Sequence, residues 1–346
     1  MHDGSGYGLI TMSSNVISKV TAKPEIGIVT VMRGVAAGLV FLFHLLCTTK
    51  GYLATDGVVS IFNYAQHGVQ IFFVISGFVI AHSMIVGSYT INKFPLFLFK
   101  RLVRIEPPYL ITVIVAASYI LLRNHYQVGN GELANPTWQQ ILLHVGYLIP
   151  LSKYDWLNIV YWTLAIEFQF YLVFALSFQL FRSGPAMRAL AQAIMVGLMF
   201  WTTNGTVFFY WTPIFLLGIN LAFFRNGLMG RQEFGAYTIV MLWLLFWKLG
   251  GVILASSLVG FLIILWNPKT DNRILHWLGM ISYSLYLTHT MVIFPIINLG
   301  FRFPLTTFNR IAFGGLAVFA SIAVSYLMYR WVEKPCKTYA SSLRYR

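Results

Sequence analysis

The sequence predicts an all-α, polytopic integral membrane protein with about ten transmembrane helices. Hydrophobic residues make up 58% of its 346 residues, charged residues only 10%, and the mean hydropathy is +0.71. A typical soluble domain carries about a quarter charged residues. The apolar residues also gather into runs that reach or approach the length of about 20 helical residues needed to cross a bilayer core.

Ten apolar runs follow one another along the chain, several of them short. They are residues 27–49, 66–87, 108–123, 157–181, 187–203, 206–224, 236–249, 251–266, 274–299 and 311–332. The weaker segment 137–149 favours a re-entrant or interfacial helix. It lies in the longest outer connection, residues 124–156, which is large enough to shape or cover a binding site.

The basic residues orient these spans. With a cytoplasmic N-terminus, seventeen Lys and Arg residues fall on inner segments and six on outer segments, and Arg33 stays within its helix. This is the positive-inside bias, so most of the net charge of +14 reflects topology and nucleic acid binding is not expected. Residues 1–26 lack the features of a cleavable signal peptide. We expect a cytoplasmic N-terminal segment (1–26), one membrane domain (27–333) and a cytoplasmic C-terminal tail (334–346).

Arg33 and His44 are ionisable residues on one otherwise apolar run. Eleven residues at ~100° each make about three turns plus 20°, so both side chains share one helix face. At ~1.5 Å per residue they lie roughly 16 Å apart along the axis, about half the thickness of a bilayer core. The shared face predicts a polar cavity, because ionisable groups are costly in hydrocarbon. Taken singly, an interfacial arginine and a histidine bonded to a neighbouring helix explain them as well.

Glu167 is a carboxylate about ten residues into the fourth span. A carboxylate at this depth is expected to be paired, protonated or functional. The plainer interpretation is a structural partner for a buried arginine or tyrosine. Gln169 and nearby Tyr and Trp residues can extend a polar network around it.

Arg101 and Arg104 are three residues apart, so on a helix their guanidinium groups share a face. Guanidinium groups suit phosphate, to whose oxygens they donate paired hydrogen bonds. The alternative is an ordinary cytoplasmic basic cluster, and from the cluster alone this interpretation is preferred. Pro107 and Pro108, which follow, predict a helix start or a break.

Ser76-Gly77 and His289 are further candidates within spans. Two small residues in a bulky apolar helix favour close helix packing, and a nucleophilic Ser76 would need a base that the sequence does not show. His289 fits a bonded interhelical histidine and a second catalytic histidine about equally. The sequence contains no Walker A loop, zinc motif of the form H-E-x-x-H or G-x-S-x-G elbow, so nucleotide hydrolysis, metal binding and serine-hydrolase chemistry lose support.

Six short motifs occur in one order over nearly the whole chain. They are Arg33-x10-His44, His67-Gly-Val-Gln-Ile-Phe-Phe-Val-Ile-Ser-Gly-Phe78, Arg101-x-x-Arg104-Ile-x-Pro107, Trp162-Thr-Leu-Ala-Ile-Glu167-Phe-Gln-Phe-Tyr171, Ile281-Ser-Tyr-Ser-Leu-Tyr-Leu-Thr-His289 and Val332-Glu-Lys-Pro335. Together they resemble the bacterial membrane acyltransferase-3 family, whose members O-acylate sugars of surface polysaccharides, lipopolysaccharides and some secondary metabolites. Two residues depart from the family pattern: Gln70 replaces a common acidic residue, and Glu106 adds a negative charge near the proposed phosphate site.

The resemblance implies a membrane O-acyltransferase domain over residues 27–333, in the bacterial inner membrane. It implies acyl-CoA, most simply acetyl-CoA, as a donor substrate, with no permanently bound cofactor, and a polysaccharide or lipid-linked sugar as the acceptor. In this hypothesis Arg101, Arg104 and Arg33 hold the phosphates of the donor. The pantetheine arm follows a cavity along the first helix to His44, which is a general base or a transient acyl carrier. Glu167 or His289 orients that imidazole or completes a proton path.

A transporter or flippase is the alternative, since an ionisable stripe can line a translocation path. A purely structural membrane partner has little reason to place Arg33, His44 and Glu167 within apolar spans.

Overall fold

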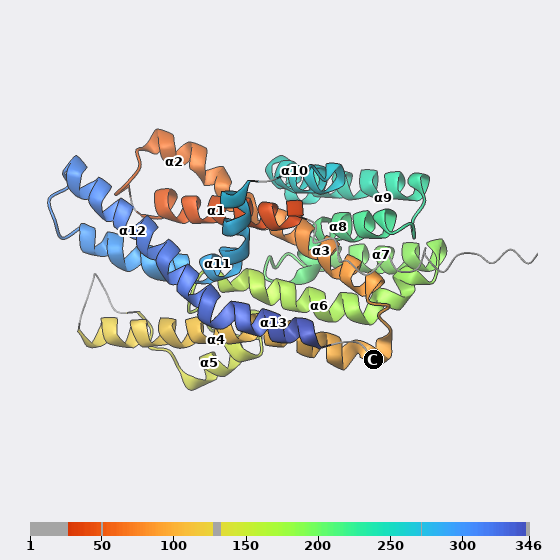
Figure 1. Ribbon diagram of the computed structural model, residues 1–346, viewed down its shortest axis with the longest axis horizontal. Coiled ribbons are helices and arrows are strands. Elements are labelled where there is room, and N and C mark those ends of the chain that lie inside the picture. The colour runs from red at the N-terminus through yellow and green to blue at the C-terminus, as the bar shows by residue number, and fades with distance from the viewer. Residues whose placement is uncertain (1–26, 50, 127–132, 271, 344–346) are drawn as a thin grey trace, which may run out of the picture.

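The structure, a computed structural model, describes residues 27–49, 51–126, 133–270 and 272–343, and every regular element in this part is a helix (Figure 1). The N-terminal segment 1–26 and the end of the tail, 344–346, lie outside the described residues. The helices are α1 (Gly27–Cys47), α2 (Asp56–Phe62), η2 (Asn63–His67), α3 (Gly68–Val86), η3 (Ile91–Lys93), α4 (Phe94–His125), α5 (Trp138–Val145), η4 (Ile149–Leu151), α6 (Tyr161–Arg182), α7 (Pro185–Phe200), η5 (Phe208–Trp211), α8 (Thr212–Arg225), α9 (Arg231–Leu244), η6 (Leu245–Leu249), α10 (Gly251–Trp266), α11 (Arg273–Gly300), α12 (Thr307–Met328), η7 (Tyr329–Glu333) and α13 (Lys334–Ser342).

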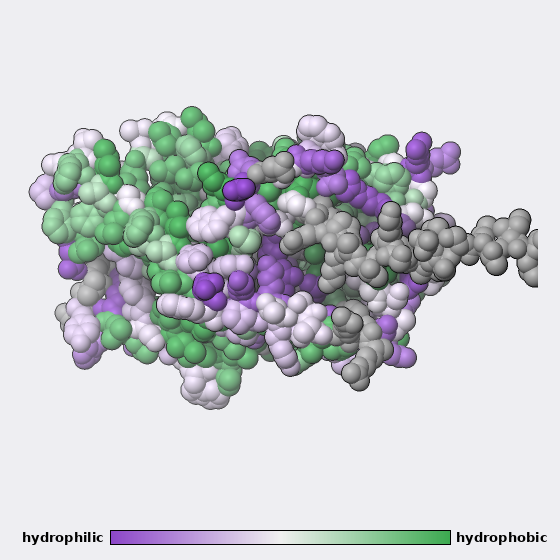
Figure 2. Space-filling view, viewed as in Figure 1, coloured by the Kyte–Doolittle hydropathy of each residue, from purple (hydrophilic) through white to green (hydrophobic). Residues whose placement is uncertain are grey.

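Each of the ten predicted spans lies on a helix, which confirms the all-α membrane fold. Seven helical stretches of the described chain are long and apolar enough to cross a bilayer by themselves. The shorter ones include α7 and α10, which are apolar but have 16 residues each. The weaker segment 137–149 forms the short helix α5 and the turn η4. Figure 2 shows apolar side chains over most of one face, with hydrophilic ones gathered near its middle.

The prediction of a helix start or break at Pro107 and Pro108 is wrong, because α4 continues through both residues. Proline removes a backbone donor from the helix, and a membrane helix tolerates it where neighbouring groups bond the backbone. Pro107 and Pro108 leave the carbonyls of Val103 and Arg104, four residues earlier, without their usual helical donors. The hydroxyl of Tyr283 on α11 donates at 2.6 Å to a different carbonyl nearby, that of Ile105.

Glycine contacts set the two closest helix pairs. At Gly34 of α1, an added Cβ would lie 2.7 Å from the backbone nitrogen of Gly279 on α11. At Gly77 of α3 it would overlap the carbonyl of Phe215 on α8, and at Gly218 that of Val74. The helix packing expected at Gly77 is therefore confirmed. These contacts hold α1 against α11 and α3 against α8.

Candidate functional site

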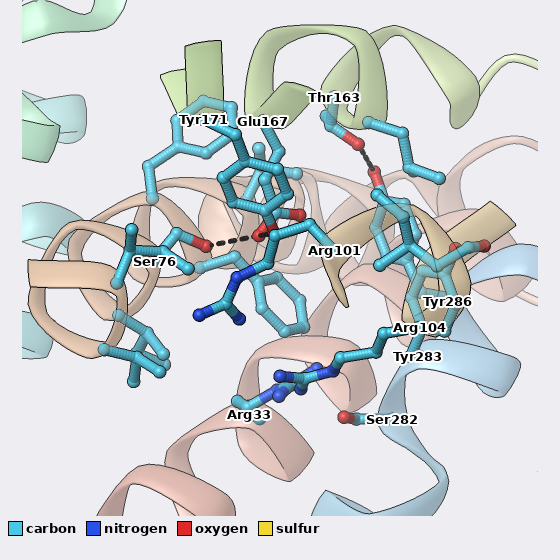
Figure 3. A pocket seen from close by; sticks show the side chains of 18 of the residues that line it. Arg33, Ser76, Arg101, Arg104, Thr163, Glu167, Tyr171, Ser282, Tyr283 and Tyr286 are labelled. Atoms are coloured by element: carbon cyan, nitrogen blue, oxygen red, sulfur yellow. Dashed lines mark hydrogen bonds between the residues drawn. The ribbon is translucent and has the colours of Figure 1, made fainter. Parts of the chain in front are cut away.

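A cavity of ≈ 90 Å³ lies among α1, α3, α4, α6, α11 and η7 (Figure 3). That volume is room for several water molecules, at about 10–15 Å³ each on this measure. Its charged and hydroxyl-bearing lining residues are Arg33, Ser76, Arg101, Arg104, Thr163, Glu167, Tyr171, Ser282, Tyr283, Tyr286 and Glu333. Residues far apart in the sequence therefore form one polar site inside an apolar bundle.

Three arginines converge on this cavity. Arg33 comes from α1, and Arg101 and Arg104 come from successive turns of α4. Arg101 donates to Ser83 Oγ at 3.0 Å, and its guanidinium lies 5.3 Å from the ring centroid of Phe97. The charges of Arg33 and Arg104 act on each other, and Figure 3 shows the two guanidinium groups approaching each other. Neither forms an ion pair with a carboxylate in the described part of the chain.

Two carboxylates line the same cavity. Ser76 Oγ donates to Oε1 of Glu167 at 2.8 Å, and the hydroxyl of Tyr171 donates to the same oxygen at 2.6 Å. Glu333, on the π-helical turn η7, accepts from the hydroxyl and the backbone N–H of Ser284 at 2.7 and 3.2 Å. With three arginines against two glutamates, the lining carries excess positive charge.

Glu106 and Gln70 are the two departures from the family pattern. Glu106 accepts a hydrogen bond from the hydroxyl of Tyr147 at 2.8 Å and does not line the cavity. Its carboxyl group is therefore bound by Tyr147 outside the cavity that the arginines line. Gln70 is buried on α3.

His44 and His289 form a buried pair between α1 and α11. Their rings are 4.9 Å apart, and Nε2 of His289 lies 3.2 Å from Nδ1 of His44. The carbonyl of Leu285, 2.9 Å from Nδ1 of His289, only accepts, so Nδ1 carries the proton and Nε2 accepts. His44 then donates from Nδ1, which also lies 2.9 Å from the carbonyl of Val40. This leaves a lone pair on Nε2 of His44, to which no described residue donates.

The six predicted site residues thus fall into two groups. Arg33, Arg101, Arg104 and Glu167 line the cavity, whereas His44 and His289 do not. The histidines are almost completely buried, with 7% and 1% of their surfaces exposed. Glu167 bonds to Ser76 and Tyr171, and no contact joins it to His44. The cavity expected to run along α1 from Arg33 to His44 therefore ends before His44 in this structure.

Four residues that line the cavity were not predicted as site residues from the sequence: Tyr171, Tyr283, Tyr286 and Glu333. Glu333 lies in the Val332-Glu-Lys-Pro335 motif, and an acidic residue at the end of the last apolar run could have marked it as a candidate. Its hydrogen bond with Ser284, 49 residues away, could not be predicted from the local sequence. Among the described residues, no three His, Cys, Asp or Glu side chains cluster as metal ligands would.

Comparisons with known proteins agree on one family. A family model described as an acyltransferase domain, Acyl_transf_3, matches residues 26–330. Three relatives from Staphylococcus aureus, strains COL, MSSA476 and MRSA252, are named "Putative O-acetyltransferase" and are each 25% identical over 361 aligned positions. The match covers 88% of this chain and 56% of each relative, so the chain spans about half the length of these relatives. No solved structure matches with significance. With the family match covering most of the chain, this membrane protein belongs to the acyltransferase-3 family.

Proposed function

We propose that this protein is a membrane O-acyltransferase that moves an acyl group, most simply acetyl, from cytoplasmic acyl-CoA to a hydroxyl of a surface or exported polysaccharide. The observation that carries the donor assignment is the convergence of Arg33, Arg101 and Arg104 on one cavity between the helices. Cations within a bilayer are costly unless a partner offsets them. The phosphates of coenzyme A supply that partner, and within the described part of the chain no carboxylate forms an ion pair with Arg33 or Arg104.

The histidine pair supports the chemical step. Nε2 of His44 removes the proton from the acceptor hydroxyl as that oxygen attacks the thioester carbonyl. The carbon–sulfur bond breaks, and the proton passes from His44 to the departing thiolate. The carbonyl of Val40, 2.9 Å from Nδ1 of His44, and Nε2 of His289, 3.2 Å away, both accept the Nδ1 proton and so favour the tautomer with a free lone pair on Nε2. An acyl-imidazole at the same Nε2 is the covalent variant of this step.

The test is acetyl-CoA turnover by protein reconstituted into lipid vesicles. We expect His44→Ala to lower transfer by about 10²–10⁴-fold, because it removes the general base. His125→Ala, at the exposed end of α4, is the matched control and should keep the parental rate. Near-parental transfer by folded His44→Ala would contradict the role of His44, and no free thiol from the parent protein would favour transport instead.

The acceptor can be identified by comparing cells with and without the gene. Mass spectrometry of their surface polysaccharides should show an acyl group that depends on this protein. Its mass gives the acyl group and its position gives the sugar hydroxyl. Identical polysaccharides in both strains would remove the carbohydrate from the proposal.

A further inference from the structure

The arginine cavity and the histidine pair are close but separate. Phe72, Thr163 and Tyr286 line the cavity, whereas Phe41, which lies beside His289 with 6.2 Å between ring centroids, does not. A bound donor that reaches His44 must therefore pass a wall of side chains.

Tyr286 is the central residue of this wall. It lies three residues before His289 on α11, so the two side chains share a face one turn apart. Their ring centroids are 6.0 Å apart. On its other side Tyr286 faces the cavity, and only 7% of its surface is exposed.

Tyr286 is held by partners on two other helices. Its hydroxyl lies 2.7 Å from Thr163 Oγ1 and 3.3 Å from the carbonyl of Val160, at the start of α6. The edge of its ring packs against Phe72 of α3, with centroids 5.8 Å apart. Figure 3 shows the bond between Tyr286 and Thr163 at the margin of the cavity, away from Ser76 and Glu167.

We propose that Tyr286, closed by its hydrogen bond to Thr163 and by Phe72, is a gate between the arginine cavity and the histidine pair. In the closed state the gate keeps water of the cavity away from Nε2 of His44. When the thioester arm of the donor fills the cavity, the tyrosine moves aside and the arm takes its place. The identity of the arm rests on the proposed function, whereas the closed wall is a feature of the structure itself.

The gate makes a prediction about water. Without it, water reaches a thioester near His44 and is activated by the same base: the water oxygen bonds to the carbonyl carbon, the carbon–sulfur bond breaks, and the acid and free thiol leave. Tyr286→Ala should therefore increase thiol release without an acceptor about tenfold. Thr163→Val keeps the shape but removes the hydroxyl, so its increase should be smaller. Tyr89→Phe removes another buried tyrosine hydroxyl, bonded to the carbonyl of Ala175 at 3.1 Å outside the cavity, and should change nothing.

Cysteine labelling tests the gate without any enzymatic activity. In a background that carries Cys47→Ser and Cys336→Ser, Phe41→Cys places a thiol beside His289 and Ser76→Cys places one in the cavity. The reagent is sulfonatoethyl methanethiosulfonate, which does not cross sealed vesicles. From the side on which Ser76→Cys reacts, Phe41→Cys should stay unlabelled with Tyr286 present and become labelled with Tyr286→Ala.

The two readouts separate the gate from the proposed function. If Phe41→Cys reacts equally in both backgrounds, or in neither while Ser76→Cys reacts, Tyr286 is not a gate. If labelling follows the expectation but the parent protein releases no thiol from acetyl-CoA, the result supports the gate at Tyr286 and contradicts acyl-CoA as the donor.

Discussion

Arg33 and Arg104, both partly exposed, approach each other at the cavity, and among the described residues no carboxylate forms an ion pair with either. Like charges this close repel. We therefore expect a bound polyanion to stabilise this pair of arginines.

Arg33→Gln and Arg104→Gln should each raise the KM for acetyl-CoA about 10- to 100-fold, the effect of losing one charge-assisted contact. With acetyl-pantetheine, which lacks the nucleotide phosphates, the same variants should match the parent. The measurement is initial-rate kinetics with both donors, and Arg231→Gln on the exposed start of α9 is the control. An equal KM change for both donors would show that the arginines do not bind phosphate.

His144 gives a pH dependence at the residue scale. It is fully buried on α5, accepts from the N–H of Leu157 at 3.2 Å, and lies 3.0 Å from the hydroxyl of Tyr109. Burial lowers the pKa of His144 from 6.5 to about 4. The folded protein therefore binds this proton less readily than the unfolded chain. The contribution of neutral His144 to the free energy of unfolding is fully present above pH 6.5 and is lost as the pH drops toward 4.

Thermal unfolding in detergent should show this loss, which reaches on the order of 3 kcal/mol at pH 4. His144→Gln cannot titrate and should lose less stability than the parent between pH 6.5 and 4. Parallel curves for the two proteins would mean that His144 does not control the acid sensitivity.

At the scale of elements, the sequence predicted where the helices lie but not how they meet. Apolar runs are local patterns, and all ten lie on helices. The bond between Ser76 and Glu167 joins residues 91 positions apart, and the pair His44–His289 joins residues 245 apart. Such contacts depend on how α1, α3, α6 and α11 pack. The break predicted at Pro107 and Pro108 was wrong, because α4 continues through both residues.

Two glycines of α1 make a matched prediction about packing. Gly34→Ala places a methyl group against the backbone of α11 and should destabilise the protein by about 1–3 kcal/mol. Gly38, one turn further along, has nothing within 4 Å of an added Cβ, so Gly38→Ala should be neutral or stabilising by up to about 1 kcal/mol. Thermal unfolding compares them, and an equal effect at both positions would argue against a tight α1–α11 contact.

At the scale of the whole molecule, the distribution of Lys and Arg predicts an orientation for the bundle. From the positive-inside bias we expect both ends of this sequence in the cytoplasm, with Arg33 nearer that side than His44. In that orientation the arginine cavity would face the compartment of the proposed acyl-CoA donor.

We expect Arg346 to lie in the cytoplasm. A fluorescent protein fused after it should then fluoresce, whereas alkaline phosphatase fused at the same position should be inactive, because the phosphatase becomes active only after export. A fusion within the connection that precedes Trp138 should give the opposite pair of results. Active phosphatase at the C-terminal position would invert the topology and put the arginine cavity on the wrong side for a cytoplasmic donor.

The glycine contacts also join four helices into one block. Gly34 meets Gly279, Gly77 meets Phe215, and Gly68 of α3 lies against the carbonyl of Ala36 on α1, so α1, α3, α8 and α11 are joined backbone to backbone. Buried aromatic rings add α6 to this block, with Phe170 4.5 Å from Phe215 and Phe178 6.0 Å from Phe223 between ring centroids. Because His44 lies on α1 and His289 on α11, the close backbone contact between Gly34 and Gly279 also fixes the relative position of the two imidazoles. The geometry of the histidine pair is therefore set by two residues that have no side chain.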